Sequence, residues 1–135
     1  MANLNIVNEK QKILFGEDSK VIEKYFSGIR CGRVLDVTDF GGDIIKAGHV
    51  IITDGKGNYK PMPVSGNAYS TLPESHSYVG VAYGTVPKSK PMVAIMTNGE
   101  VNEKLVPFEM KTIADAFKEA CPNIVFVKDE DIDAV

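Results

Sequence analysis

The middle of this sequence is cut by turn-forming residues into short runs that favour β-strands. Nine of the twelve glycines and six of the seven prolines fall between Gly41 and Pro107. The runs between them are rich in β-branched and aromatic residues, which suit a pleated sheet. They are Val34 to Thr38, His49 to Thr53, Tyr78 to Thr85, Met92 to Thr97 and Val101 to Val106. The predicted fold class is α+β, mostly β: a small barrel- or sandwich-like β domain of short strands with one or two short helices.

Several turns in this stretch can be assigned to residue types. Asp54-Gly55-Lys56-Gly57-Asn58 offers two glycines for positive φ angles, and Asn98-Gly99 is a common hairpin dipeptide. Both are expected to reverse the chain. Ala47-Gly48 is expected to form a turn that starts a strand at His49. Pro61 and Pro63 cannot donate to a sheet ladder, so pairing should stop or become an edge there.

Helical periodicity occurs in two places. Thr112 is expected to cap a helix with Asp115 as a shortened capping box, and Pro122 ends it. Its apolar face holds Ile113, Phe117 and Ala120. A second helix is predicted from Asp18 to Phe26, where the shared face holds Val21, Ile22, Tyr25 and Phe26 and Gly28 ends it.

The length of 135 residues predicts one domain. We expect an N-terminal arm and short helix over 1–30, a β-rich body with a C-terminal helix and strand over 31–128, and an acidic tail over 129–135. The last strand of the body is Ile124 to Val127. The segment from Pro63 to Ser77 has no periodicity and is long for a loop, so it is either a plain surface loop or a functional one.

Composition argues against several classes of function. No apolar run approaches the ~18 residues of a membrane-spanning helix, so no membrane partner is expected. The formal charge of −3 does not suit a nucleic-acid partner. The first ten residues lack the pattern of a secretory signal, which predicts that the chain stays in the compartment where it is made.

Few residues are suited to catalysis or metal binding. The possible bases are His49, expected to be a satisfied structural histidine, and His76, in a loop. Cys31 and Cys121 lack zinc-ligand spacing and are expected to be free thiols. The carboxylate pairs Asp36 with Asp39 and Glu109 with Asp115 cannot be distinguished from surface charges.

Glycine-rich motifs for cofactors and cations are also missing from the sequence. Asp54 to Asn58 resembles the start of a calcium loop but is followed by Tyr59 and Ser65, where an EF-hand needs glycine and glutamate. No glycine-rich phosphate loop occurs. The sequence therefore predicts neither an enzyme, nor a metal site, nor a cofactor.

The amino end has the pattern of a docking arm. Leu4, Ile6 and Val7 stand among Asn3 and Asn5, which is compatible with an extended segment that adds a strand to another protein's sheet. The alternative is a frayed or self-packed terminus. These five residues are the predicted binding residues.

The order of short motifs from Ala47 to Phe117 resembles the head decoration proteins of tailed bacteriophages such as phage lambda. The motifs are Ala47-Gly48-His49-Val50-Ile51, Tyr59-Lys60-Pro61-Met62, Tyr78-Val79-Gly80-Val81-Ala82, Met92-Val93-Ala94-Ile95, Asn98-Gly99-Glu100-Val101 and Leu105-Val106-Pro107. They cover about half of the chain.

The resemblance implies a structural role in the virion. It implies a small β-rich protein on the capsid surface, acting as a homotrimer whose partner is the major capsid protein and which reinforces the shell. Two alternatives remain open: a phage head fibre or tail component, and a small intracellular ligand-binding β-barrel or enzyme.

Overall fold

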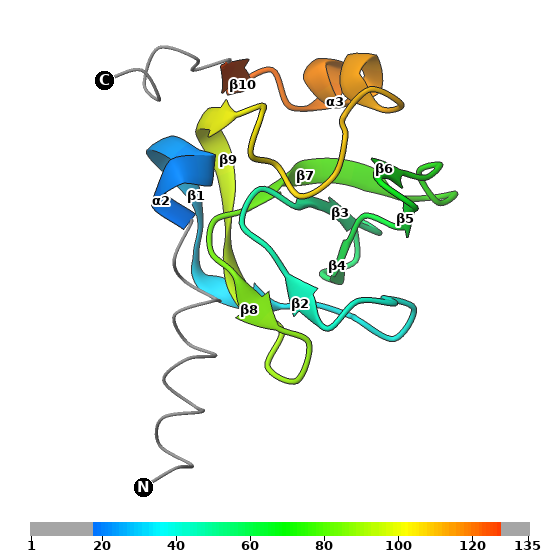
Figure 1. The fold of residues 1–135 in the computed structure, drawn as a ribbon. Coiled ribbons are helices and arrows are strands. Elements are labelled where there is room, and N and C mark those ends of the chain that lie inside the picture. Colours follow the sequence, from blue (N-terminus) through cyan, green and yellow to red (C-terminus); the bar gives the residue numbers. More distant parts are fainter. Residues whose placement is uncertain (1–17, 128–135) are drawn as a thin grey trace, which may run out of the picture.

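The structure of the protein is a computed structural model that describes residues 18–127, apart from the side chains of residues 18, 19, 30 and 31 (Figure 1). In chain order the elements are α2 (Asp18–Val21), β1 (Ile22–Val34), β2 (Ile44–Ile45), β3 (Val50–Thr53), β4 (Tyr59–Pro61), β5 (Val64–Ser65), β6 (Ala68–Tyr69), β7 (Ser77–Ala82), β8 (Val86–Pro87), β9 (Met92–Asn102), α3 (Ala114–Ala120) and β10 (Ile124–Val127).

The prediction of an α+β, mostly β domain is confirmed. The main sheet has the order β1-β9-β7-β3-β4, and β10 pairs with β9 in parallel while the other pairs are antiparallel. Two small sheets, β2-β8 and β5-β6, stand beside it. A single parallel bridge from Leu35 to Tyr59 joins the chain after β1 to the far edge of the sheet. The described strands do not close into a barrel.

The main sheet has a hydrophobic cluster on each of its two sides. Neighbouring residues on three adjacent strands enter different clusters because side chains alternate along a strand. Ile52, Val81 and Met96 belong to the cluster that includes Phe117. Their neighbours Ile51, Ala82 and Ile95 belong to the other cluster, with Phe40 and Ile45. The sheet therefore lies between two packed layers.

The hairpin predicted at Asn98-Gly99 is wrong, because β9 runs straight through these residues. Gly99 pairs with Tyr25 of β1 on one side and Ile124 of β10 on the other, and its N–H donates to the Asn123 carbonyl at 3.1 Å. A Cβ on Gly99 would overlap the Lys24 carbonyl oxygen. The glycine is thus needed for close approach of two strands rather than for a turn.

The helix predicted from Asp18 to Phe26 is also largely wrong. Helix α2 ends at Val21, and β1 begins at Ile22 and pairs with β9 through several register shifts. Phe26, expected on the buried face, is 67% exposed. Pairing with a strand about 75 residues away in sequence outweighs the local helical pattern.

Only the first residue of the strand predicted over Val34 to Thr38 belongs to a strand. Val34 is the last residue of β1. The Asp36 carboxylate then accepts hydrogen bonds from the Thr38 N–H at 3.1 Å and the Thr38 hydroxyl at 2.6 Å. A side-chain turn of this kind competes with strand pairing, so the chain bends there.

The expected turn at Asp54 to Asn58 is confirmed. It joins β3 to β4, Gly55 and Gly57 have positive φ angles, and the Asp54 carboxylate accepts hydrogen bonds from the backbone N–H groups of Lys56 and Asn58. Pairing stops at Pro61 on the edge strand β4, as predicted.

The turn predicted before His49 is present, whereas the segment from Pro63 to Ser77 has more structure than a plain loop. Gly48 has φ +89° and the His49 N–H donates to the Lys46 carbonyl, as expected of a turn. The 63–77 segment is not a plain surface loop, since it contains the β5-β6 hairpin and buries Tyr69.

The C-terminal helix and strand form as predicted, with a different start. Helix α3 begins at Ala114, and the Thr112 hydroxyl donates to the Tyr69 carbonyl at 2.8 Å instead of capping the helix. Phe117 is fully buried and its ring contacts those of Tyr78 and Phe126. Ala120, expected on the buried face, is exposed. Figure 1 shows α3 and β10 together at one end of the sheet.

Gly80 provides a test of how closely the central strands must approach. A Cβ at this position would overlap the Met96 carbonyl oxygen, whereas a Cβ at Gly41 would meet no atom within 4 Å. We expect Gly80→Ala to lower the free energy of unfolding by about 3 kcal/mol, because the overlap forces β7 away from β9. Gly41→Ala, the control, should change it by less than about 0.5 kcal/mol. Urea unfolding measures both, and equal effects would contradict this account.

Candidate functional site

The predicted docking arm lies outside the described residues. This applies to Asn3, Leu4, Asn5, Ile6 and Val7, and also to the acidic tail over 129–135. Residues 18–127 contain no group of three or more His, Cys, Asp or Glu side chains placed to hold a metal ion. In the same range, no helix has the length and apolar character needed to cross a bilayer.

His49 is fully buried at the start of β3, as the structural interpretation of this residue expects. Its Nε2 lies 3.0 Å from the Met62 carbonyl oxygen. A carbonyl can only accept, so Nε2 carries the proton and Nδ1 of the neutral ring has a lone pair. Nδ1 has no hydrogen-bond partner, so the ring is only half satisfied.

Aromatic rings surround His49 on several sides. Their centroids lie 5.7 Å away for Phe40, 5.4 Å for Tyr69 and 5.4 Å for Phe108, all edge-on. Burial lowers the pKa of His49 to about 4, against an ordinary 6.5, and the hydrogen bond to Met62 opposes this only in part. The imidazole is therefore neutral near pH 7 and cannot serve as a general acid there.

Within the described residues, no hydrogen bond joins the His49 ring to Cys121 or His76. Cys121 is a buried free thiol, as expected, and burial raises its pKa to about 11, so it is not a thiolate near pH 7. His76 lies in the loop before β7, with Nδ1 2.9 Å from the Glu74 carbonyl oxygen. The Cys121 thiol therefore lacks the activated state that a nucleophilic cysteine needs.

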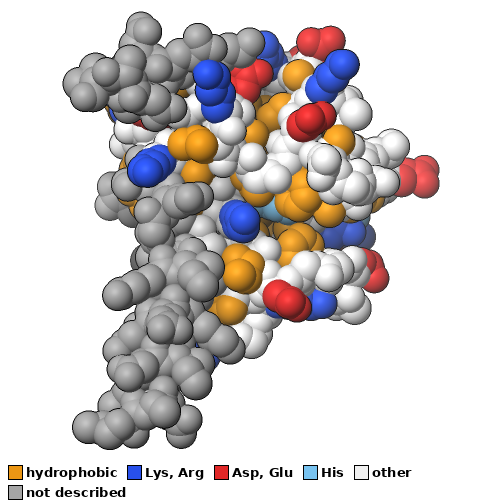
Figure 2. Space-filling view, in the orientation of Figure 1, with side chains coloured by type: hydrophobic (Ala, Val, Ile, Leu, Met, Phe, Trp, Pro, Cys, Tyr) orange, Lys and Arg blue, Asp and Glu red, His pale blue; other side chains and the backbone are white. Residues whose placement is uncertain are grey.

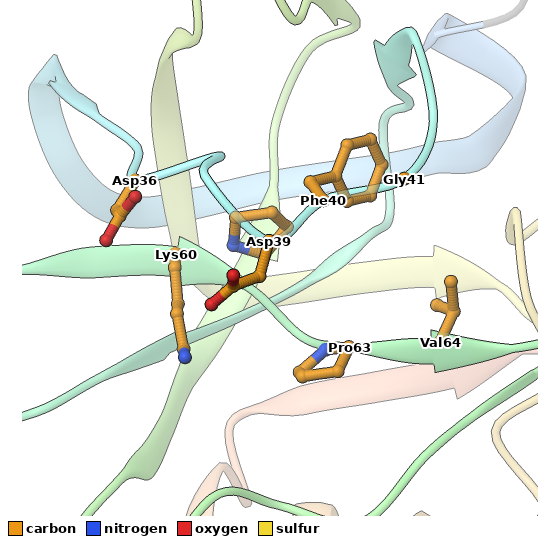
Figure 3. Close-up of a pocket in the computed structure, with 8 residues that line it drawn as sticks. Asp36, Asp39, Phe40, Gly41, Lys60, Pro63 and Val64 are labelled. Atoms are coloured by element: carbon orange, nitrogen blue, oxygen red, sulfur yellow. The ribbon is translucent and has the colours of Figure 1, made fainter.

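A pocket of about 260 Å³ lies where the loop after β1 meets the segment from β4 to β5. We call it the Asp39 pocket. It is lined by Asp36, Asp39, Phe40, Gly41, Lys60, Pro61, Pro63 and Val64. Figure 3 shows the three charged side chains towards one end of the pocket and Phe40, Pro63 and Val64 towards the other. It combines charged groups with an apolar wall.

The loop that forms one wall of the pocket is held by several hydrogen bonds. The Asp36 N–H donates to the Tyr59 carbonyl at 2.8 Å, which fixes the loop against β4. The Lys88 ammonium donates to the Phe40 carbonyl at 2.6 Å, and the Lys88 N–H donates to the Asp43 carbonyl. The wall of the pocket is thus pre-organised.

The charged groups of the pocket differ in how they are used. The two hydrogen bonds from Thr38 hold the pKa of Asp36 below its usual range, with a smaller contribution from the charge of Lys60. Both of these bonds go to Oδ1 of Asp36. Sequence reasoning noted Asp36 with Asp39 but had no signal that Lys60 and the prolines lie beside them.

Exposed apolar side chains form a second surface feature. Val34 and Met92 are 68% and 57% exposed and are direct cross-strand partners at one end of the β1-β9 ladder. On the face in Figure 2, hydrophobic side chains are interspersed with both acidic and basic ones. Val34 lies on the same edge strand, β1, as the exposed Phe26, and Met92 lies on the neighbouring strand β9.

Comparisons with known proteins leave the chain without an assigned family. No family model, no curated protein and no solved structure matches it.

His49 predicts how stability depends on pH. Between pH 6.5 and 4 the unfolded chain takes up a proton that the folded chain does not, so the free energy of unfolding falls as pH falls, by about 3 kcal/mol. His49→Gln keeps an N–H donor but does not titrate, so its urea-unfolding profile should be flatter across this range. Hydrogen bonds lower the pKa of Asp36 and Asp54, so the stability that these carboxylates contribute is present at neutral pH and is lost as the pH falls through the acidic range where carboxylates titrate.

The same change at the loop histidine is the matched control. His76→Gln should retain the wild-type dependence of unfolding free energy on pH. If His76→Gln flattens the profile and His49→Gln does not, the assignment to the buried ring is wrong.

Proposed function

We propose that this chain is a structural virion protein that decorates and stabilises the outside of a bacteriophage capsid. It binds the major capsid protein through its N-terminal arm and body loops, and it acts as a homotrimer. The sequence resemblance to phage head decoration proteins suggests this class. The proposal assigns the chain a binding role and no catalytic one.

The observation that carries the proposal is an exposed apolar edge on the strand that follows the arm. Phe26 and Val34 of β1 are exposed, and Met92 extends the apolar surface across the ladder. Apolar side chains gain about 1.5–3 kcal/mol each when a partner covers them. Under the proposal, these exposed side chains and the arm contact the same large partner.

The chemistry of the described residues supports binding over catalysis. His49 is buried and neutral, and the Cys121 thiol is protonated and buried. Five of the six motifs that carry the resemblance overlap β3, β4, β7 or β9, and these four strands form most of the main sheet. These observations favour a rigid β body used as a docking part.

The direct test is mass spectrometry of purified virions from the phage that encodes the chain, with the major capsid protein as internal standard. A decoration protein should be present at a copy number comparable to that of the shell protein. A head fibre or tail component would be present at far lower numbers. Absence from virions would contradict both and favour the ligand-binding or enzymatic alternative.

The arm can be tested separately from the body. The triple variant Leu4→Ser, Ile6→Ser and Val7→Ser should weaken binding to expanded capsids by at least about tenfold, because three apolar side chains lose burial. The triple variant Leu4→Ile, Ile6→Leu and Val7→Ile is the control, because it keeps apolar side chains at the same three positions, and it should bind nearly as well as the wild type. Co-sedimentation with capsids measures binding. Thermal unfolding should be unchanged in both.

Oligomeric state gives an independent result. Chemical cross-linking of the protein on capsids, read by mass spectrometry, should give trimers as the largest abundant species. A chain that stays monomeric both in solution and on capsids would contradict the trimer while leaving capsid binding intact.

A further inference from the structure

The Asp39 pocket has charged groups that keep hydrogen-bonding capacity for a ligand. Within the described residues, Asp39 and Lys60 take part in no ion pair or side-chain hydrogen bond, and Asp36 is bonded only through Oδ1. Two carboxylates against one ammonium leave the pocket with a formal charge of −1. The pocket therefore favours a ligand that carries a positive charge.

The wall opposite the charges selects the rest of the ligand. Phe40, Pro61, Pro63 and Val64 offer apolar surface beside the carboxylates. A purely polar cation would leave the apolar surface exposed to water. A neutral apolar ligand would displace water from Asp39 and Lys60 without offering these charged groups a hydrogen-bond or ionic partner. A cationic head on a short hydrocarbon stem satisfies both parts, as in the side chains of arginine and lysine.

Arginine suits this pocket better than lysine. A guanidinium is flat, is more weakly hydrated than an ammonium and presents several N–H donors in a fixed fork that can engage two carboxylates at once. The free Oδ2 of Asp36 and both oxygens of Asp39 are acceptors for such a fork. The stem of the same side chain would pack along Phe40 and Pro63.

We propose that the Asp39 pocket binds an arginine side chain presented by a protein partner. The loop after β1, which forms one wall of the pocket, is already held by hydrogen bonds. Little of the backbone therefore has to be ordered when a ligand binds, and this favours recognition of a single side chain. Under the proposed function the partner is the capsid protein, and only this naming of the partner rests on that function. The chemistry of the pocket stands independently of it.

The test uses Nα-acetyl-L-arginine amide as the probe, titrated into the ¹⁵N-labelled full chain and followed by two-dimensional NMR. Saturable shifts are expected at the backbone amides of Gly41, Lys60 and Val64, with a dissociation constant in the millimolar range. The citrulline analogue has the same shape without the charge and should bind at least about tenfold more weakly. Equal binding of the two probes, or no saturable shift at these amides, would overturn the proposal.

Two carboxylate variants localise the effect. Asp39→Asn should weaken arginine binding by about tenfold because it removes one charge from the pocket. Asp115→Asn changes an exposed carboxylate on α3 and should leave binding unchanged. Asp39 is exposed, so both variants should keep the wild-type spectrum away from the pocket. Equal weakening by both variants would show a non-specific charge effect and would overturn the assignment.

The capsid experiment separates this inference from the proposed function. Arginine binding without any capsid binding would contradict the decoration role and retain the pocket as an arginine site. Capsid binding with no arginine binding would contradict the pocket alone. If the chain binds capsids, Asp39→Asn should weaken that binding and Asp115→Asn should not. Equal capsid binding by the two variants would exclude the capsid protein as the source of the arginine.

Discussion

The antiparallel pairing of β9 with β1 and β7 is the interaction on which the rest of the structure depends. β9 is the one strand of the described residues that contacts both the N-terminal strand and the C-terminal strand β10. Its neighbouring residues Ile95 and Met96 enter opposite hydrophobic clusters. A shift of one residue in its register would exchange these two side chains between the clusters. Both cores are therefore fixed by one ladder.

The dependence on β9 explains which elements could be predicted from the sequence. The β3-β4 turn, α3 and β10 are set by residues close together in sequence, and each was predicted close to its true position. Asn98-Gly99 has the local preference for a hairpin, but partners on both sides hold it extended. The 18–26 segment has a helical pattern, but Ile22 and Tyr25 pair with β9 as part of strand β1. Non-local pairing decided both cases, and a single sequence does not contain that information.

The candidate site follows the same division. Asp36 and Asp39 are visible in the sequence as a close pair of carboxylates, and nothing local distinguishes them from surface charges. The two carboxylates become part of a pocket because the Leu35–Tyr59 bridge places their loop against β4, and so beside Lys60. His49 was expected to be a satisfied structural histidine, and it is fully buried but only half satisfied. Its ring environment comes from three segments far apart in sequence, so the unpaired Nδ1 could not be foreseen.

Phe40 connects the surface pocket to the buried histidine. Phe40 lines the Asp39 pocket, and its ring packs in a T-shaped arrangement against the ring of His49. The carbonyl of Phe40 accepts a charge-assisted hydrogen bond from Lys88, which holds the backbone from which this ring enters the core. Protonation of His49 would place a positive charge against this ring and its neighbours, at a high desolvation cost. The packing that keeps His49 neutral is thus the same packing that shapes the apolar wall of the pocket, and loss of one would disturb the other.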